Sequence, residues 1–127
     1  MMRRMSKLDV TARAALSVEE SPYGTVGVVH AGSELDAWWI WKDGEAVEPT
    51  FAILDHDDLL YVVRGSLRLE LEGSKPSVLR AGELFVIPAG TPFRGARWPR
   101  DGEPCQFLAV APAGSTFTRL GAEALDE

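Results

Sequence analysis

Short apolar runs separated by turn residues recur along most of the chain. The clearest alternation covers residues 67–71, where leucine takes every second position and arginine or glutamate the positions between. This period of two is typical of a strand with one buried face. Further runs of β-branched, aromatic or aliphatic residues cover 25–30, 37–42, 51–54, 77–80, 84–87 and 105–111. We therefore predict an all-β fold, a sandwich or closed barrel of short strands, because a sheet without covering helices buries one face against another sheet.

The length of 127 residues fits one domain, and no internal repeat, low-complexity tract or linker divides the chain. We expect an N-terminal extension over 1–20, a single barrel domain over 21–119 and an acidic tail over 120–127. The extension could hold a short helix or a strand, and it closes at turn-forming residues 21–24.

The formal charge of −6 disfavours a sequence-independent hold on nucleic acid or on an anionic membrane, because both depend on Lys and Arg neutralising negative charge. No stretch has the length of a membrane span, and no signal peptide is recognisable. Cys105 is the only cysteine, which excludes an intrachain disulfide and favours a reducing, cytoplasmic location. We expect Cys105 to be a small buried apolar residue and the partners to be small molecules or proteins.

Two spacings in the second half of the chain are specific. Asp58 is followed by six residues and then Gly65, while Gly82 is followed by five residues, Pro-Ala-Gly at 88–90, and Phe93. Together they resemble the two motifs of the cupin family, G-x5-HxH-x3–4-E-x6-G and G-x5-PxG-x2-H-x3-N. The resemblance implies a cupin-type double-stranded β-helix, also called a jelly-roll barrel.

The resemblance covers roughly residues 35–112 and also indicates what is missing. In metal-bearing cupins, the two histidines and the glutamate of the first motif and the histidine of the second bind one ion inside the barrel. With a four-residue spacer, the corresponding positions are Phe51, Ile53, Asp58 and Phe93. A three-residue spacer selects Ala52 and Leu54 for the first pair instead. Hydrocarbon side chains have no lone pair to give a metal, so we expect neither a metal ion nor another cofactor.

The polar run at 55–58, Asp-His-Asp-Asp, has three readings: a metal site, an acid/base centre or a turn. We predict a solvated turn for Asp55 to Asp57, because alternate side chains of a strand point to opposite faces. The motif places Asp58 toward the barrel lumen, where burial would raise its pKa and suit it to general acid/base catalysis, with His56 as a weaker second candidate. The alternative is that a backbone N–H or a buried arginine holds the Asp58 carboxylate.

Aromatic and basic residues supply further candidate contacts. Alternation places Trp39 and Trp41 on one face of their strand and Trp38 on the other, so that one face lines the lumen and the other packs elsewhere. The sequence does not decide between these faces, and core filling is the alternative to a ligand wall. Arg97 takes the position of the second motif's asparagine and could hold a carboxylate or phosphate, unless residues 93–100 form an ordinary solvated loop.

Three functions fit these observations. The first is a metal-independent cupin that binds a small organic ligand in an aromatic-lined lumen, as a binding or accessory protein. The second is a metal-independent isomerase, epimerase or cyclase that uses Asp58, and the third is a dimeric interaction module with a filled barrel. The candidate ligand contacts are Trp39, Trp41, Phe51, Ile53, Phe93 and Arg97. We also expect a homodimer, because open sheet edges need covering.

Overall fold

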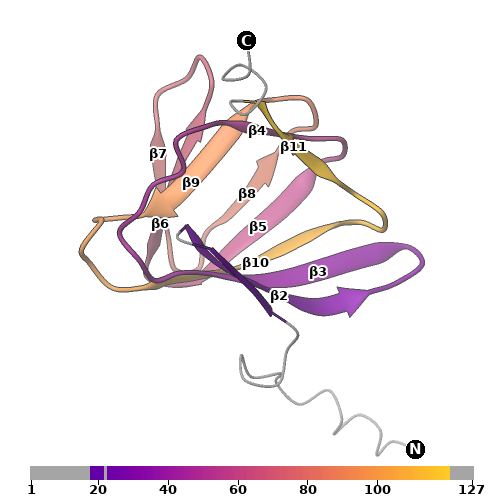
Figure 1. Ribbon diagram of the computed structural model, residues 1–127, viewed down its shortest axis with the longest axis horizontal. Coiled ribbons are helices and arrows are strands. Elements are labelled where there is room, and N and C mark those ends of the chain that lie inside the picture. Colours follow the sequence, from indigo (N-terminus) through magenta and orange to yellow (C-terminus); the bar gives the residue numbers. More distant parts are fainter. Residues whose placement is uncertain (1–17, 22, 121–127) are drawn as a thin grey trace, which may run out of the picture.

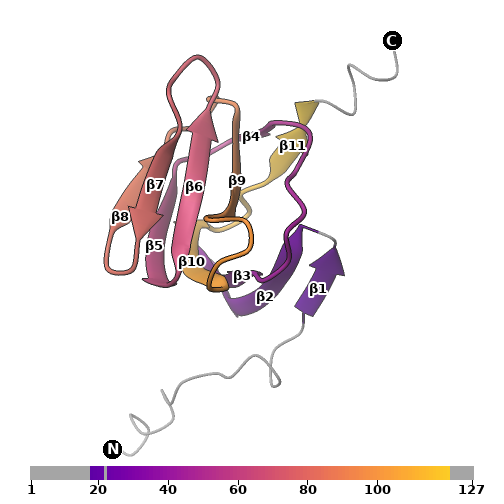
Figure 2. The same cartoon turned by 90° about the vertical axis from the view of Figure 1, so that its left-hand side faces the viewer.

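The protein folds into two antiparallel β-sheets that face each other (Figures 1 and 2). The computed structural model describes residues 18–21 and 23–120. The strands among these residues are β1 (Val18–Ser21), β2 (Gly24–Ala31), β3 (Leu35–Lys42), β4 (Ala52–Leu54), β5 (Asp58–Arg64), β6 (Ser66–Leu71), β7 (Ser77–Arg80), β8 (Leu84–Ile87), β9 (Phe93–Arg97), β10 (Cys105–Pro112) and β11 (Phe117–Arg119). Sheet A has the strand order β1-β2-β3-β10-β5-β8, and sheet B has the order β11-β4-β9-β6-β7. The all-β jelly-roll prediction is confirmed.

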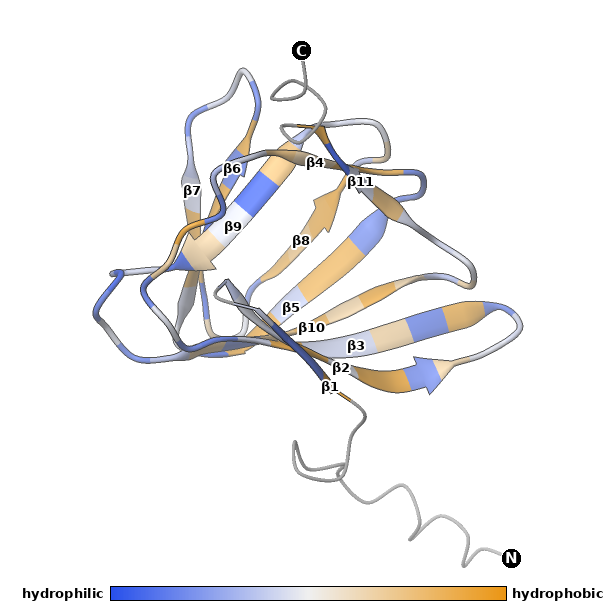
Figure 3. Ribbon diagram, viewed as in Figure 1, coloured by the Kyte–Doolittle hydropathy of each residue, from blue (hydrophilic) through white to orange (hydrophobic). Residues whose placement is uncertain are grey.

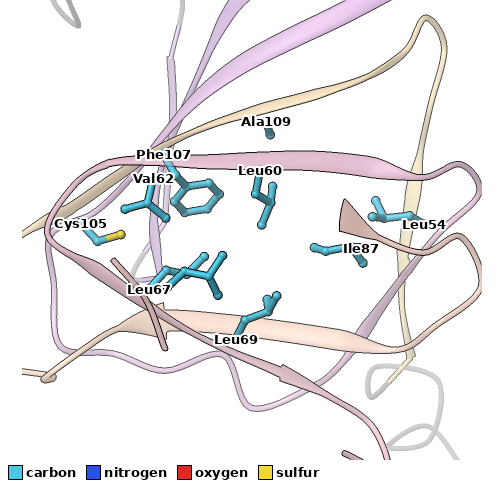
Figure 4. Packing of buried hydrophobic residues seen from close by; sticks show 10 residues of the cluster. Leu54, Leu60, Val62, Leu67, Leu69, Ile87, Cys105, Phe107 and Ala109 are labelled. Carbon is cyan, nitrogen blue, oxygen red and sulfur yellow. The ribbon is translucent and has the colours of Figure 1, made fainter. Parts of the chain in front are cut away.

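The core lies between the two sheets, and the alternation predicted for 67–71 is confirmed. Leu67 and Leu69 of β6 are buried, while Arg68 and Glu70 between them are partly exposed on the other face. Leu60 of β5 and Leu69 of β6 point toward each other from opposite sheets (Figure 4). Hydrophobic residues fill β8 along its whole length (Figure 3).

The motif glycine at position 65 is explained by the turn between β5 and β6. Gly65 has a φ of +70°, a conformation that side chains rarely adopt. A Cβ at this position would also collide with the carbonyl oxygen of Pro104. Both constraints require glycine here, and the turn sends the chain from sheet A to sheet B.

The ends of the chain and two strands differ from the sequence expectations. Strand β1 takes in the last residues of the expected 1–20 extension and pairs with β2. Residues 1–17 and 121–127, most of the expected extension and tail, lie outside the described residues. Strands β9 and β11 were not anticipated, and the expectation of a solvated loop at 93–100 is wrong because β9 pairs with β6 over most of it.

Among the described residues, no helix has the length and the hydropathy needed to cross a lipid bilayer.

Candidate ligand cavity

The two sheets line a cavity of about 850 Å³ that is partly open to solvent. Most of its wall is apolar and comes from both sheets. Sheet A contributes Trp38, Ile40, Leu60, Ile87, Phe107 and Ala109. Sheet B contributes Ala52, Leu54, Leu67, Leu69 and Phe93. The predicted contact Phe93 therefore lies on the cavity wall, and side chains do not fill the whole space between the sheets.

The register of β4 corrects the expected ligand contacts Phe51 and Ile53. Ala52 and Leu54 are buried and line the cavity, whereas Phe51 and Ile53 are not on its wall. The ring of Phe51 instead lies under the guanidinium of Arg94, 4.5 Å from the ring centroid. The three-residue spacer is thus the correct one, and the four-residue spacer assigned every side chain of β4 to the wrong face.

The cavity residues do not fit the metal that other cupins hold. At the positions of the family's ligands stand Ala52, Leu54, Asp58 and Phe93. A divalent ion there would meet a single carboxylate and three hydrocarbon side chains. In the described part of the chain, no group of three or more His, Cys, Asp or Glu residues is arranged to bind a metal.

Asp58, at the start of β5, is a polar residue that lies among apolar side chains of the cavity wall, as the motif predicted. Its Oδ1 atom is buried and has no hydrogen-bond partner, so neither a backbone N–H nor a buried arginine satisfies it. Burial raises the pKa of the Asp58 carboxyl from 3.8 to about 7, because the charged form loses its hydration. Near neutral pH this group therefore populates both protonation states.

The three residues before Asp58 form an exposed turn, as predicted. Asp55 accepts hydrogen bonds from the backbone N–H and the hydroxyl of Thr116, at 2.8 and 3.1 Å. The backbone N–H of Thr116 is the main cause of a lowered pKa at the Asp55 carboxyl, with smaller contributions from His56. Asp57 accepts a 2.8 Å hydrogen bond from the backbone N–H of Ala89. The carboxylates of this turn thus join it to neighbouring loops.

His56, the weaker catalytic candidate, is not on the cavity wall. About half of its side chain is exposed, and its Nδ1 atom lies 3.1 Å from Oδ1 of Asp55. His56 therefore belongs to the surface turn, and the geometry gives it no access to a ligand in the cavity.

Strand β3 corrects the expected ligand contacts Trp39 and Trp41, because its other face points into the cavity. Trp38 and Ile40 line the cavity, so Trp39 and Trp41 lie on the outer face of sheet A. Trp39 begins a row of cross-strand neighbours on that outer face: Leu108, Tyr61 and Leu84. Strand alternation predicted the two groups correctly, but nothing in the sequence identified the inner one.

Arg97 does not reach the cavity either. Its side chain is buried, and it donates hydrogen bonds to the backbone carbonyls of Arg100, at 2.8 Å, and Asp43, at 3.3 Å. Arg94 donates to the carbonyl of Pro49 at 3.0 Å, and Arg100 donates to that of Glu45. We call Arg94, Arg97 and Arg100 the arginine clamp, because together they hold the loop between β3 and β4. The prediction that Arg97 binds a ligand anion is replaced by this structural role.

Sequence reasoning missed a charged group on the cavity wall. Oε2 of Glu48 lies 3.6 Å from Nζ of Lys42 and 3.2 Å from a terminal nitrogen of Arg119. All three residues line the cavity. The alternation that places Trp38 and Ile40 inward extends to Lys42 and could have identified it. Glu48 and Arg119 carry no comparable signal, since a loop and an unanticipated strand supply them.

Cys105 is fully buried, as predicted. Desolvation raises the pKa of its thiol to about 12, despite an opposing effect of Lys42. The thiol therefore stays protonated and is not a nucleophile at physiological pH.

Comparison with known proteins agrees with this architecture. The family model described as "Cupin domain" matches residues 37–111, more than half of the chain. A search of curated proteins gives no match.

Several solved structures resemble this chain in fold. A putative mannose-6-phosphate isomerase from Ralstonia eutropha JMP134 is 30% identical, with a TM-score of 0.65 over 83% of this chain and 97% of that one. The polyketide cyclase RemF from Streptomyces resistomycificus is 20% identical, with a TM-score of 0.72 over 88% and 84% of the two chains. KdgF from Halomonas sp. is 24% identical, with a TM-score of 0.65 over 80% and 91%. The last two likenesses carry information on the fold alone.

Proposed function

Because the chain belongs to the cupin family, we propose that it uses the barrel interior as that family does, but binds a small organic ligand there without a metal ion. The observation that carries this proposal is the unpartnered Oδ1 atom of Asp58 inside an apolar cavity. A buried polar atom without a partner costs about 1–3 kcal/mol, which a ligand group placed beside it would recover. The side chains at the family's metal-ligand positions, one carboxylate and three hydrocarbons, support binding without a metal ion.

The ligand's chemistry follows from the wall. An aromatic and aliphatic lining favours a hydrocarbon body, with Trp38 and Phe93 offering flat surfaces for rings. At the Asp58 end the ligand needs one hydrogen-bonding group, which meets a carboxylate above pH 7 and a carboxylic acid below it.

A fluorescent probe tests the binding function. N-phenyl-1-naphthylamine, which has two aromatic units and one N–H donor, should bind the wild-type protein with an increase in emission. Ala109→Trp should abolish this binding because Ala109 lies on the cavity wall, whereas Ala37→Trp on the outer face of sheet A should not. Circular dichroism checks that both variants fold, and Ala109→Leu serves if the larger substitution unfolds the protein. Equal binding by the cavity variant and the outer-face variant contradicts the proposal.

A second candidate function is proton-transfer catalysis, which the raised pKa of Asp58 favours. A carboxyl that titrates near pH 7 in an apolar site can take a proton from a bound C–H or O–H acid and return it at another position, as isomerases, epimerases and cyclases require. In this role the protein binds the ligand as proposed above and also converts it, with Asp58 as the proton-transfer group.

Solvent exchange separates the two functions. A ligand that co-purifies with the protein is incubated in D₂O with wild type or with Asp58→Asn, and its mass is followed. A catalyst should incorporate deuterium into the ligand only with the wild-type carboxyl, while both proteins retain affinity. Identical masses with both proteins leave binding as the function.

A further inference from the structure

The cavity has a second polar end, remote from Asp58. Lys42 pairs with Cys105 across strands β3 and β10, and Leu59, which follows Asp58, pairs with Val110. These levels are five residues apart along β10, or about 17 Å at the rise of a strand. A ligand that enters the cavity therefore meets Asp58 and Lys42 at opposite ends of one sheet.

Lys42 has hydrogen-bonding capacity that the described residues do not use. Its side chain is only 12% exposed, and its ammonium group contacts Oε2 of Glu48 at 3.6 Å, beyond hydrogen-bonding distance. No hydrogen bond from this ammonium to the described residues accompanies the ion pair. An ammonium has three donors, and because Lys42 lines the cavity these donors are available to an acceptor on a bound ligand.

Arg119 brings a second cation to the same carboxylate oxygen. Its guanidinium donates to Oε2 of Glu48 at 3.2 Å, so two positive charges share one negative charge. Lys42 belongs to sheet A and Arg119 to sheet B, and the arginine clamp fixes the loop that carries Glu48. Two cations from opposite sheets thus meet at one carboxylate oxygen, which leaves a local excess of one positive charge.

Two further charges limit what can bind. Glu19 and Glu20 of β1 also border the cavity, and they are exposed. Their charge repels any anion, and it repels a dianion such as a phosphate ester about twice as strongly as a monoanion. A single negative charge, which the local excess charge of the cation pair matches, is therefore favoured.

We propose that Lys42 and Arg119 form an oxyanion-binding subsite, and that the ligand is an amphipathic monocarboxylic acid whose hydrocarbon body fills the cavity. This proposal rests on the binding function proposed above and names its ligand class. Glu48 is the resident counter-ion, which a ligand carboxylate joins or replaces at the two cations. The competing interpretation is an ion cluster that only ties β3 to β11.

Calorimetry with matched ligands at pH 7.5 tests the subsite. Octanoate, octan-1-ol and octyl phosphate share one hydrocarbon chain, and the phosphate ester carries nearly two charges at this pH. Octanoate should bind the wild-type protein about tenfold more tightly than octanol, since charge-assisted hydrogen bonds are the strong ones. Octyl phosphate should bind no more tightly than octanoate, and tighter phosphate binding overturns the assignment to a monocarboxylate.

Variants separate recognition from structure. Lys42→Met and Arg119→Met should each bring the affinity for octanoate to within about twofold of the affinity for octanol. Arg64→Met removes a surface cation as a matched control, and it should leave the roughly tenfold preference for octanoate unchanged. Glu48→Gln should raise octanoate affinity several-fold without changing that of octanol, because the competing anion is gone. A purely structural cluster predicts that Glu48→Gln lowers the melting temperature and leaves both affinities unchanged, which overturns the proposal.

Failures of the two proposals look different. Equal wild-type affinities for octanoate and octanol overturn the subsite and leave the binding function intact. The absence of binding by both, together with no signal from N-phenyl-1-naphthylamine, overturns the binding function and the subsite with it.

Discussion

The guanidinium of Arg97 donates a hydrogen bond to the carbonyl oxygen of Asp43, 3.3 Å away, and thereby joins positions 54 residues apart in the sequence. Through this contact the end of β9 holds the start of the loop between β3 and β4. Arg94, three residues earlier, holds the end of the same loop at Pro49. The loop carries Glu48 to the cavity wall, so the order of the charged end of the cavity depends on arginines that never touch it.

Removing Arg97 should destabilise the fold. Arg97→Met removes the part-buried, charge-assisted hydrogen bonds that this guanidinium donates to the carbonyls of Asp43 and Arg100, and we expect a loss of about 3 kcal/mol. Urea denaturation with an unchanged m-value measures the loss. Arg64→Met, which removes an exposed pair with Glu103, should cost less than about 1 kcal/mol. Equal losses in the two variants would show that the clamp is not a stabilising element.

Asp58 should make the protein less stable as pH rises. Its pKa is raised from 3.8 to about 7 on folding, so between these values the folded state binds more protons than the unfolded state. The free energy of unfolding therefore falls as pH increases across this window, by an amount on the order of 4 kcal/mol, and levels off above pH 7. Asp58→Asn lacks this dependence. The free energy of unfolding of Asp58→Asn, relative to that of wild type, should grow from near zero at pH 4 to its maximum at pH 8. Parallel plots of the two free energies against pH contradict the raised pKa.

Grafting histidines should convert the cavity into a metal site. The triple variant Ala52→His, Leu54→His, Phe93→His surrounds Asp58 with three imidazoles, and we expect it to bind Co²⁺ or Zn²⁺ with micromolar or tighter affinity. Added metal should raise its melting temperature by mass action. The visible absorption of Co²⁺ reports the coordination.

The matched control for this graft shifts two histidines by one residue. Phe51→His and Ile53→His, combined with Phe93→His, place two imidazoles on the face of β4 that points away from the cavity. This variant should bind no metal in the barrel. Metal binding by the shifted variant alone means that the register of β4 is wrong.

Self-association remains a prediction, and the outer face of sheet A is where we expect it to show. Leu84 and Val86 of the edge strand β8 are 62% and 47% exposed, beside exposed Leu59 and Tyr61 of β5. Light scattering should give a dimer mass for wild type and a monomer mass for Leu84→Glu, a surface substitution with little effect on the monomer's stability. A monomer mass for wild type at working concentration contradicts the homodimer.

The sequence was most informative where a local pattern had a single solution. Leucine at 67 and 69 predicted a half-buried strand, and the interval from Asp58 to Gly65 placed that aspartate in the lumen. Both features depend on neighbours in the chain, namely strand alternation and a turn that only glycine fits. The barrel and the position of Asp58 in its lumen follow from them.

The sequence was least informative about which face of a strand points inward. A spacer of three or four residues fits the cupin motif equally well, and the choice decides between Ala52 and Phe51 on the cavity wall. Trp38 and Trp39 present the same ambiguity, because both faces of β3 are apolar. Arg97 was misassigned for a different reason: its partners are backbone carbonyls from a distant loop, and a side-chain pattern does not record them.

Strands β1 and β11, the first and last that the structure describes, are edge strands of different sheets, and both border the cavity. They lie on the same side of the molecule (Figure 2). A reporter or affinity handle inserted in either strand would thus displace part of the cavity wall. The exposed hairpin at Gly73 and Ser74, between β6 and β7, is the better attachment point for labels.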